Sequence, residues 1–192
     1  IGWCDWSSDV CSSDLRLLQE QLLEQLGELR AHARAAGGRV AYLKPHGALY
    51  NTAADDPEVA GVVVATVLED ADSHRQLPVL ALPGSALALR ARAAGVEVEA
   101  EAFADRAYTG TGRLVPRSHD GAVITDPAEV VARVLRLERE GVLESADGVD
   151  LTIAARSVCL HSDTDGAVDL ARRVRQALWA AGVVLMPFSG VR

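Results

Sequence analysis

Apolar positions follow two different periods along the chain. Between Leu17 and Leu29 leucines recur at helical spacing, and Gly37-Gly38 ends the run. A short apolar stretch then predicts a buried strand over residues 39–43. The string Asp55-Asp56-Pro57-Glu58 joins an aspartate cap, a proline in the first turn and an acid near the positive end of the helix dipole. It therefore predicts a helix that runs to about Asp70.

The alternation of strand and helix continues after this helix. The sequence predicts a short buried strand over residues 78–82 and a helix over 86–94 that Gly95 ends. Apolar and acidic residues then alternate with period two over residues 96–102, which predicts a strand with one buried face and one acidic face in polar surroundings. Residues 103–125 form a long glycine-containing loop, and loops of this length are often binding elements.

Four more elements are predicted in the last third of the chain. The string Asp126-Pro127-Ala128-Glu129 repeats the earlier helix start and predicts a helix to about Glu140. Residues 149–153 fit a short strand or a hairpin arm, and 157–160 fit a buried strand. A last helix is expected to start from a cap at Thr164 or Asp165 and to reach Ala181, with Gly182 as its stop.

This order of elements predicts an α/β fold. Strands that alternate with helices form parallel βαβ units, and short apolar strands suit a barrel or a doubly wound sheet. The pattern shows about four main strands, whereas a closed barrel needs roughly eight. If the fold is a barrel, the chain therefore holds part of it, with the first strands missing.

The first fifteen residues differ in composition from the rest. They hold two of the three tryptophans and two of the three cysteines, and they lack the basic start and apolar centre of a signal peptide. Residues 5–15 read like a translated sequencing adapter, so we interpret residues 1–15 as a foreign or disordered segment. A natural, poorly ordered extension is the alternative. On the first interpretation, residues 16–192 are the carboxyl-terminal part of a single domain, and the chain is an amino-truncated fragment.

Charge and cysteine content narrow the class of protein. The formal net charge is −8 and no basic stripe appears, which argues against nucleic acid and anionic membrane as partners. No apolar run approaches the roughly 20 residues that span a bilayer. Three sparse cysteines without zinc-like spacing favour a reducing compartment, so we expect a cytoplasmic protein without a metal–cysteine site.

Polar side chains gather where three of the predicted strands end. The carboxyl ends of parallel strands meet at one edge of a sheet or barrel, so we expect the three clusters to share a rim where a small molecule binds. The first cluster holds Lys44, His46, Tyr50 and Asn51; the second holds Asp105, Arg106 and Tyr108; the third holds His161, Asp163 and Thr164.

Each candidate role has a structural alternative. His46 is a candidate general acid or base, and Lys44 is a candidate for neutralising a phosphate or an oxyanion. A hydrogen bond to a neighbouring loop and an ion pair explain these two residues equally well. Arg106 suits bidentate clamping of a carboxylate, with a structural ion pair to Asp105 as the alternative.

Two further segments carry groups that suit an anion or a metal ion. The string from His161 to Gly166 contains hard-ion ligands, but capping of the next helix explains Asp163 or Thr164, and we predict no metal ligand. Arg113 and Arg117 in the long loop lie within reach of an anionic ligand, with surface solvation as the default. No Walker loop and no GxGxxG motif is present, so any nucleotide site must be built another way.

Four strings in register make the chain similar to the LamB/YcsF family. They are KPHGALYN at residues 44–51, FADRAY at 103–108, LVPRSHDGAVITDP at 114–127 and VCLHSDTDGAV at 158–168. The resemblance covers residues 17–184. It implies a partial (β/α) barrel of the glycoside hydrolase and deacetylase type, with the family's first strand and its acidic and histidine motifs missing. We therefore expect the fragment itself to be inactive. Ser162 and Asp165 depart from the glycine and proline usual in the family.

The resemblance also implies an activity and partners. Members are the A subunit of an enzyme that opens 5-oxo-L-proline to L-glutamate with hydrolysis of ATP, which we expect with Mg2+, and they work with B and C subunits. On this basis Lys44, His46, Asp105 and Arg106 are the expected catalytic residues, and the other residues of the three clusters bind substrate. The alternatives are a metal-dependent amide or sugar deacetylase and a non-catalytic interaction subunit.

Overall fold

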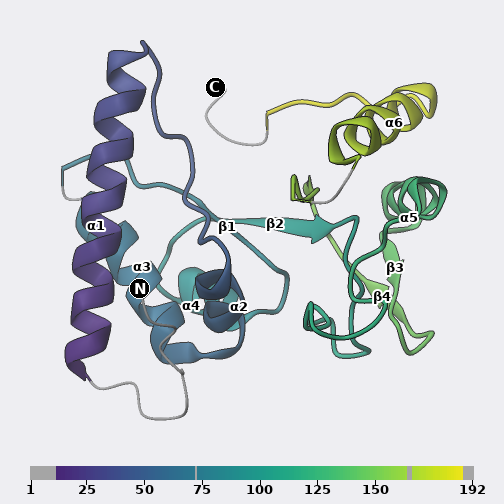
Figure 1. Ribbon diagram of the computed structural model, residues 1–192. Helices are drawn as coiled ribbons and strands as arrows, with labels where there is room; N and C mark the ends of the chain where they lie inside the picture. The colour runs from purple at the N-terminus through teal and green to yellow at the C-terminus, as the bar shows by residue number, and fades with distance from the viewer. Residues whose placement is uncertain (1–11, 72, 164–165, 188–192) are drawn as a thin grey trace. The chain divides into compact units, whose positions relative to one another are not determined.

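The computed structural model describes residues 12–71, 73–163 and 166–187 (Figure 1). The chain divides into two compact units, residues 1–98 and 99–192. Each unit has its own hydrophobic core and its own set of helices and short strands.

The first unit is mostly helical and contains one short strand. Its elements are α1 (Ser12–Ala35), α2 (Ala48–Asp55), α3 (Pro57–Ala71), β1 (Val79–Ala81) and α4 (Ala86–Ala93). Helix α3 packs against the other three helices, and the long α1 runs alongside it (Figure 1). Val63 and Val67 of α3 meet Leu87 of α4 in the core. The run of small and branched apolar residues in α3 therefore explains why this helix is central.

Local hydrogen bonds fix where these helices begin. The side chain of Asp56 accepts hydrogen bonds from the backbone N–H groups of Glu58 at 2.7 Å and Val59 at 3.2 Å, which satisfies donors that the first turn of α3 leaves unpaired. The Ser85 hydroxyl does the same for Ala88 at the start of α4, at 3.1 Å. Arg30 of α1 and Asp70 of α3 form an ion pair that joins the two helices.

The second unit combines a parallel strand pair, a hairpin and two helices. Strand β2 (Val98–Phe103) pairs in parallel with β5 (Ser157–Cys159), with Phe103 opposite Cys159. Helix α5 (Pro127–Glu140) begins at an Asp126 cap and ends at Gly141, whose φ of 67° is left-handed. Strands β3 (Val142–Glu144) and β4 (Asp150–Thr152) form an antiparallel hairpin.

Helix α6 (Ala167–Ala180) completes the second unit by packing on α5. Their apolar faces meet in one cluster that contains Val130, Val134, Leu170, Val174 and Leu178. Both faces repeat at helical spacing, as expected for two amphipathic helices that cover each other. None of the helices in the described ranges has the length and apolar character needed to cross a bilayer.

Most of the predicted elements are confirmed. The α/β class with parallel strand pairing is as expected, and it is consistent with part of a (β/α) barrel. The helices that start at the two Asp-Pro strings, the helix over 86–93, and the strands at 79–81, 98–103 and 157–159 lie where predicted. The region 149–153 is a hairpin arm whose partner, β3, was not predicted.

Four details in the first half of the chain differ from the prediction. The strand over residues 39–43 is reduced to a single parallel bridge between Leu43 and Val79. Residues 48–55 form helix α2, which was not predicted. Helix α1 begins at Ser12, so residues 12–15 are helical and Leu15 packs on the core, while residues 1–11 lie outside the described residues. The acidic face of β2 is buried, since Glu99 and Glu101 are only 5% and 1% exposed.

Two more corrections concern the end of the chain. Strand β5 is only partly buried, because Val158 points outward and is exposed. The residue at the cap position of α6 is Gly166, without a side-chain cap, while Thr164 and Asp165 lie outside the described residues. The division into two units leaves the single-domain assignment of residues 16–192 a prediction.

Replacing Leu87 with alanine tests the core of the first unit. Leu87 is buried in α4, whereas Leu89 on the same helix is exposed. We expect Leu87→Ala to lower the free energy of unfolding by about 2–4 kcal/mol and Leu89→Ala to change it by less than about 0.5 kcal/mol. Urea unfolding of both variants measures the difference. Both substitutions change helix propensity alike, so equal losses would contradict the assigned core.

Candidate functional site

Asp105 and His161 form a close pair at the ends of two parallel strands. Asp105 follows β2 and His161 follows β5, so the pairing of these strands brings the two residues together. The His161 ring Nδ1 lies 2.9 Å from Asp105 Oδ1, and the His161 backbone N–H donates to Oδ2 at 2.8 Å. The carboxylate therefore holds both the ring and the backbone of His161. The predicted meeting of the second and third clusters is what the geometry shows.

Burial and hydrogen bonding oppose each other at Asp105. The Asp105 side chain is 1% exposed, and burial alone would raise its pKa. The hydrogen bonds and the positive character of His161 outweigh this effect and hold the pKa of Asp105 below its ordinary value. Asp105 is therefore a carboxylate at neutral pH and accepts the proton on His161 Nδ1. In the neutral imidazole, Nε2 is then the basic nitrogen.

The aromatic ring of Phe103 packs against the imidazole, and Tyr108 in turn bonds to Phe103. The rings of Phe103 and His161 are stacked, with centroids 5.6 Å apart and an interplanar angle of 19°. The backbone N–H of Phe103 donates to the Tyr108 hydroxyl at 2.8 Å. Tyr108 is fully buried, and burial raises the pKa of its phenol, so the group stays neutral. The hydroxyl of Tyr108 thus contacts the end of β2, and its contact with substrate stays a prediction.

Arg106 holds the long loop rather than facing outward. Its Nε donates to the Ala122 carbonyl at 3.2 Å and its Nη2 to the Val115 carbonyl at 2.6 Å. The residue is buried, and burial together with repulsion from Arg117 lowers its pKa. The described side-chain partner of Asp105 is His161, so the structural ion pair between Asp105 and Arg106 that was the alternative interpretation is not among the described contacts. The role of Arg106 as a clamp for a substrate carboxylate stays a prediction.

Arg117 contacts a residue of the third predicted cluster, although the sequence favoured plain solvation for it. Its Nη1 donates to Asp163 Oδ2 at 2.7 Å, and both side chains remain exposed. This hydrogen bond lowers the pKa of Asp163. The contact joins the long loop to the segment just after His161. In the sequence, only the position of Arg117 in the glycine-containing loop indicated this contact, and that indication is weak.

The first predicted cluster belongs to the other unit. The Lys44 ammonium lies 5.5 Å from the centre of the Tyr50 ring, a cation–π contact. Tyr50 is buried, and His46 and Asn51 are exposed, with Tyr50 and Asn51 on α2. The expected meeting of this cluster with Asp105 and His161 stays a prediction.

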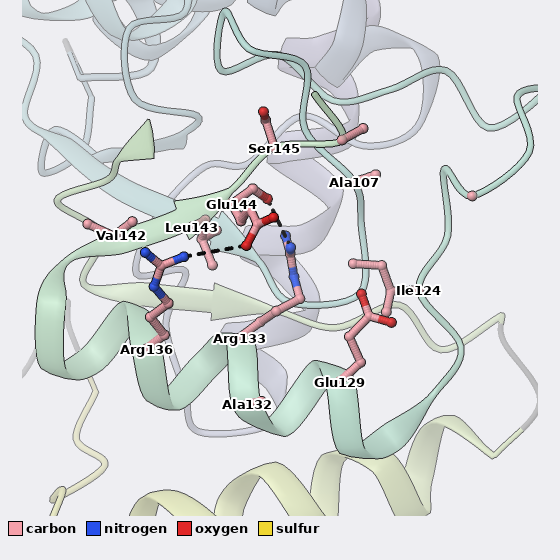
Figure 2. Close-up of a pocket in the computed structure, with 12 residues that line it drawn as sticks. Ala107, Ile124, Glu129, Ala132, Arg133, Arg136, Val142, Leu143, Glu144 and Ser145 are labelled. Carbon is pink, nitrogen blue, oxygen red and sulfur yellow. Dashed lines mark hydrogen bonds and ion pairs between the residues drawn. The ribbon is translucent and has the colours of Figure 1, made fainter. Parts of the chain in front are cut away.

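A pocket of about 390 Å3 lies beside the base of the long loop in the second unit (Figure 2). Arg133 of α5 runs along it and donates to the Glu144 carbonyl at 3.0 Å and to the Arg106 carbonyl at 3.2 Å. Arg136 lies one turn further along α5 and faces Glu144 (Figure 2). Asp105 and His161 are not among the residues that line this pocket. Arg133 thus links α5 to β3 and to the backbone of Arg106, the residue that follows Asp105.

The described residues do not include a group of three or more histidine, cysteine or acidic side chains that is close enough to hold a metal ion. Thr164 lies outside the described residues, so its predicted role is not addressed by the geometry. The chemistry that the described site offers is that of a carboxylate-oriented imidazole with an arginine nearby.

Comparisons with known proteins agree on one family. The LamB/YcsF family model matches residues 11–192. The A subunit of a 5-oxoprolinase from Streptomyces avermitilis is 54% identical over 173 residues, which are 90% of this chain and 68% of that protein. A 5-oxoprolinase A subunit from Pseudomonas syringae pv. tomato is 43% identical over 100% of this chain and 73% of its own length. The crystal structure of a lactam utilization protein from Thermus thermophilus has a TM-score of 0.82 at 39% identity, covering 91% of this chain and 68% of that one.

Replacing Asp105 with asparagine tests the pair. The folded-state pKa of Asp105 lies below its unfolded value of about 3.8, so its charge stabilises the fold above that pH. This contribution is lost as the pH falls through the folded-state pKa. We expect Asp105→Asn to cost about 1–3 kcal/mol at pH 7, and the difference from the parent protein to shrink below pH 3.8.

Denaturant unfolding between pH 7 and pH 2 measures this difference. Asp120→Asn is the matched control, because Asp120 is an exposed carboxylate on the same loop. A difference for Asp105→Asn that stays constant down to pH 2 would show that the charge on Asp105 is not what His161 stabilises.

Proposed function

The chain belongs to the LamB/YcsF family, and on that premise we propose that it acts as the A subunit of a 5-oxoprolinase that opens the lactam of 5-oxo-L-proline to L-glutamate. The observation that carries the proposal is the Asp105–His161 pair at 2.9 Å, with the carboxylate buried and the imidazole partly exposed. The names of the relatives support the substrate and the reaction. The name of the Thermus thermophilus protein, a lactam utilization protein, supports lactam chemistry.

His161 is the general base in this proposal. Opening a lactam requires water to add to the carbonyl carbon, and the proton of that water must be removed as the bond forms. Nε2 of His161 accepts this proton, because Nδ1 is engaged with Asp105. The buried carboxylate stabilises the imidazolium that results. The electron pair of the broken C–N bond goes to nitrogen, which takes up a proton to become the amine of glutamate.

The family resemblance is the basis for the roles that we propose for His46 and Lys44. We assign to His46 the delivery of a proton to the leaving nitrogen, and to Lys44 the neutralisation of charge on oxygen or phosphate. When bound, ATP with Mg2+ supplies a phosphoryl group for the amide oxygen and so makes the ring carbon a better electrophile. One water is then consumed at the C–N bond and a second at the phosphate. The B and C subunits are the proposed partners, and the cytoplasm is the proposed compartment.

Replacing His161 in the full-length protein tests the proposed general base. We expect His161→Gln to lower kcat for glutamate formation by about 10²–10⁴-fold in the assembly with its partner subunits, the usual range for loss of a general acid–base group. Asp105→Asn is expected to lower kcat less, because the imidazole remains but loses its orientation. His119→Gln, at an exposed position of the long loop that contains Asp105, serves as the control. Near-normal turnover of His161→Gln would remove the proposed base.

A second substitution tests the proposed acid in the first unit. His46→Ala removes the group assigned to protonate the leaving nitrogen, so we expect kcat to fall by at least about 100-fold. Turnover of the variant is measured in the full-length protein assembled with its partner subunits. His32→Ala on the exposed face of α1 is the control. If His46→Ala retains normal turnover, the proton comes from another group.

A further inference from the structure

The long loop of the second unit has a rigid base and an exposed tip. Arg106 binds the carbonyls of Val115 and Ala122 on opposite arms of the loop. The backbone of Ala107 also bonds both arms, donating to Ala122 and accepting from Val115, each at 3.0 Å. Residues 116–121 beyond these contacts are all exposed. The base is therefore fixed by several hydrogen bonds, and the exposed tip contacts Asp163 through Arg117.

Arg117 is the cation that this tip presents. Its described side-chain partner is Asp163 at 2.7 Å, two residues beyond His161. The contact uses one guanidinium nitrogen, although a guanidinium has five N–H donors arranged to bind a carboxylate in a bidentate manner. Asp163 feels the charges of both Arg117 and His161, and Arg106 feels that of Arg117. These groups therefore share one electrostatic environment.

The pair of Arg117 and Asp163 is of a kind that exchanges easily. Both side chains are well exposed, at 44% and 63%, and exposed ion pairs contribute little to stability. Arg106 is different, because its donors are buried and bound to loop carbonyls whose loss would leave polar groups unsatisfied. Arg117 is therefore a cation that an incoming carboxylate can reach. The donors of Arg106 are already used to hold the loop.

We infer that Arg117 recognises the carboxylate of the substrate, exchanging its contact with Asp163 for one with the bound acid. This inference rests on the proposed function and names the residue that selects an acidic lactam over a neutral one. Arg117 is thus a specificity residue, and Asp163 is a competing internal ligand that occupies it in the absence of substrate. This inference departs from the sequence prediction, in which Asp163 and Arg106 contact the substrate directly.

The test compares an acid with its neutral analogue in the full-length protein assembled with its partner subunits. The KM for 5-oxo-L-proline and the inhibition constant of 5-oxoprolinamide are measured for the parent, Arg117→Gln, Arg117→Lys and Asp163→Asn. Arg172→Gln is the matched control, because Arg172 forms an exposed ion pair with Asp169 at 3.0 Å on α6. Measured kcat for each variant separates binding from chemistry.

Arg117→Gln is expected to raise KM for the acid by about 10- to 100-fold, the range for a hydrogen bond to a charged group, with kcat and the inhibition constant of the amide nearly unchanged. Arg117→Lys should restore part of the affinity, and Arg172→Gln should change nothing. Asp163→Asn should lower KM for the acid, because the competing carboxylate is removed.

Two results would overturn the inference. An unchanged KM in Arg117→Gln, or an equal rise in the inhibition constant of the amide, would show that Arg117 does not read the carboxylate. A rise in KM for Asp163→Asn that matches that of Arg117→Gln would show that the ion pair only shapes the loop. Failure of the proposed function looks different, because the parent assembly would then not turn over 5-oxo-L-proline at all.

Discussion

The arrangement of the second unit depends on the hydrogen bonds between Asp105 and His161. A carboxylate with 1% exposure is costly to bury unless its charge is compensated, and here the imidazole and a backbone N–H provide the compensation. The same bonds require β2 and β5 to end side by side, since each strand delivers one partner. The pair therefore stabilises the strand register and orients a proton-transfer group at once. Removing either partner would affect both properties.

Residues around the pair hold it in place through successive contacts. Phe103 lies against the imidazole and is itself held by the Tyr108 hydroxyl, so the ring of His161 is fixed in plane as well as in direction. Arg106 holds the two arms of the loop, and Arg133 in turn donates to the Arg106 carbonyl. A site that must keep a proton-transfer group within a few tenths of an ångström benefits from such layers. The described contacts of these buried polar residues thus help to position the site.

Sequence reasoning found this site through chemistry and strand ends, and it missed what depends on tertiary contacts. The Asp-Pro strings and the strand ends at Asp105 and His161 carry local signals, which predicted the helix starts and a shared rim for these two residues. They did not predict that Asp105 bonds to His161. The strand predicted before Lys44 is only a bridge, because pairing depends on neighbours that a local pattern does not contain. The alternating acids in β2 suggested a solvated face, yet Glu101 is buried, since burial is decided by what packs over a strand.

The two side-chain pairs near the site differ in whether their contact is permanent or exchangeable. Asp105 and His161 are bonded through several atoms and the carboxylate is buried, so breaking the contact would leave that carboxylate without water or a partner. Arg117 and Asp163 meet through one nitrogen in solvent, where water can replace either partner at little cost. Orientation of the base must persist through every turnover, whereas recognition of an anion must be reversible. The burial of each pair matches the demand on it, which is why we place proton transfer at His161 and anion selection at Arg117.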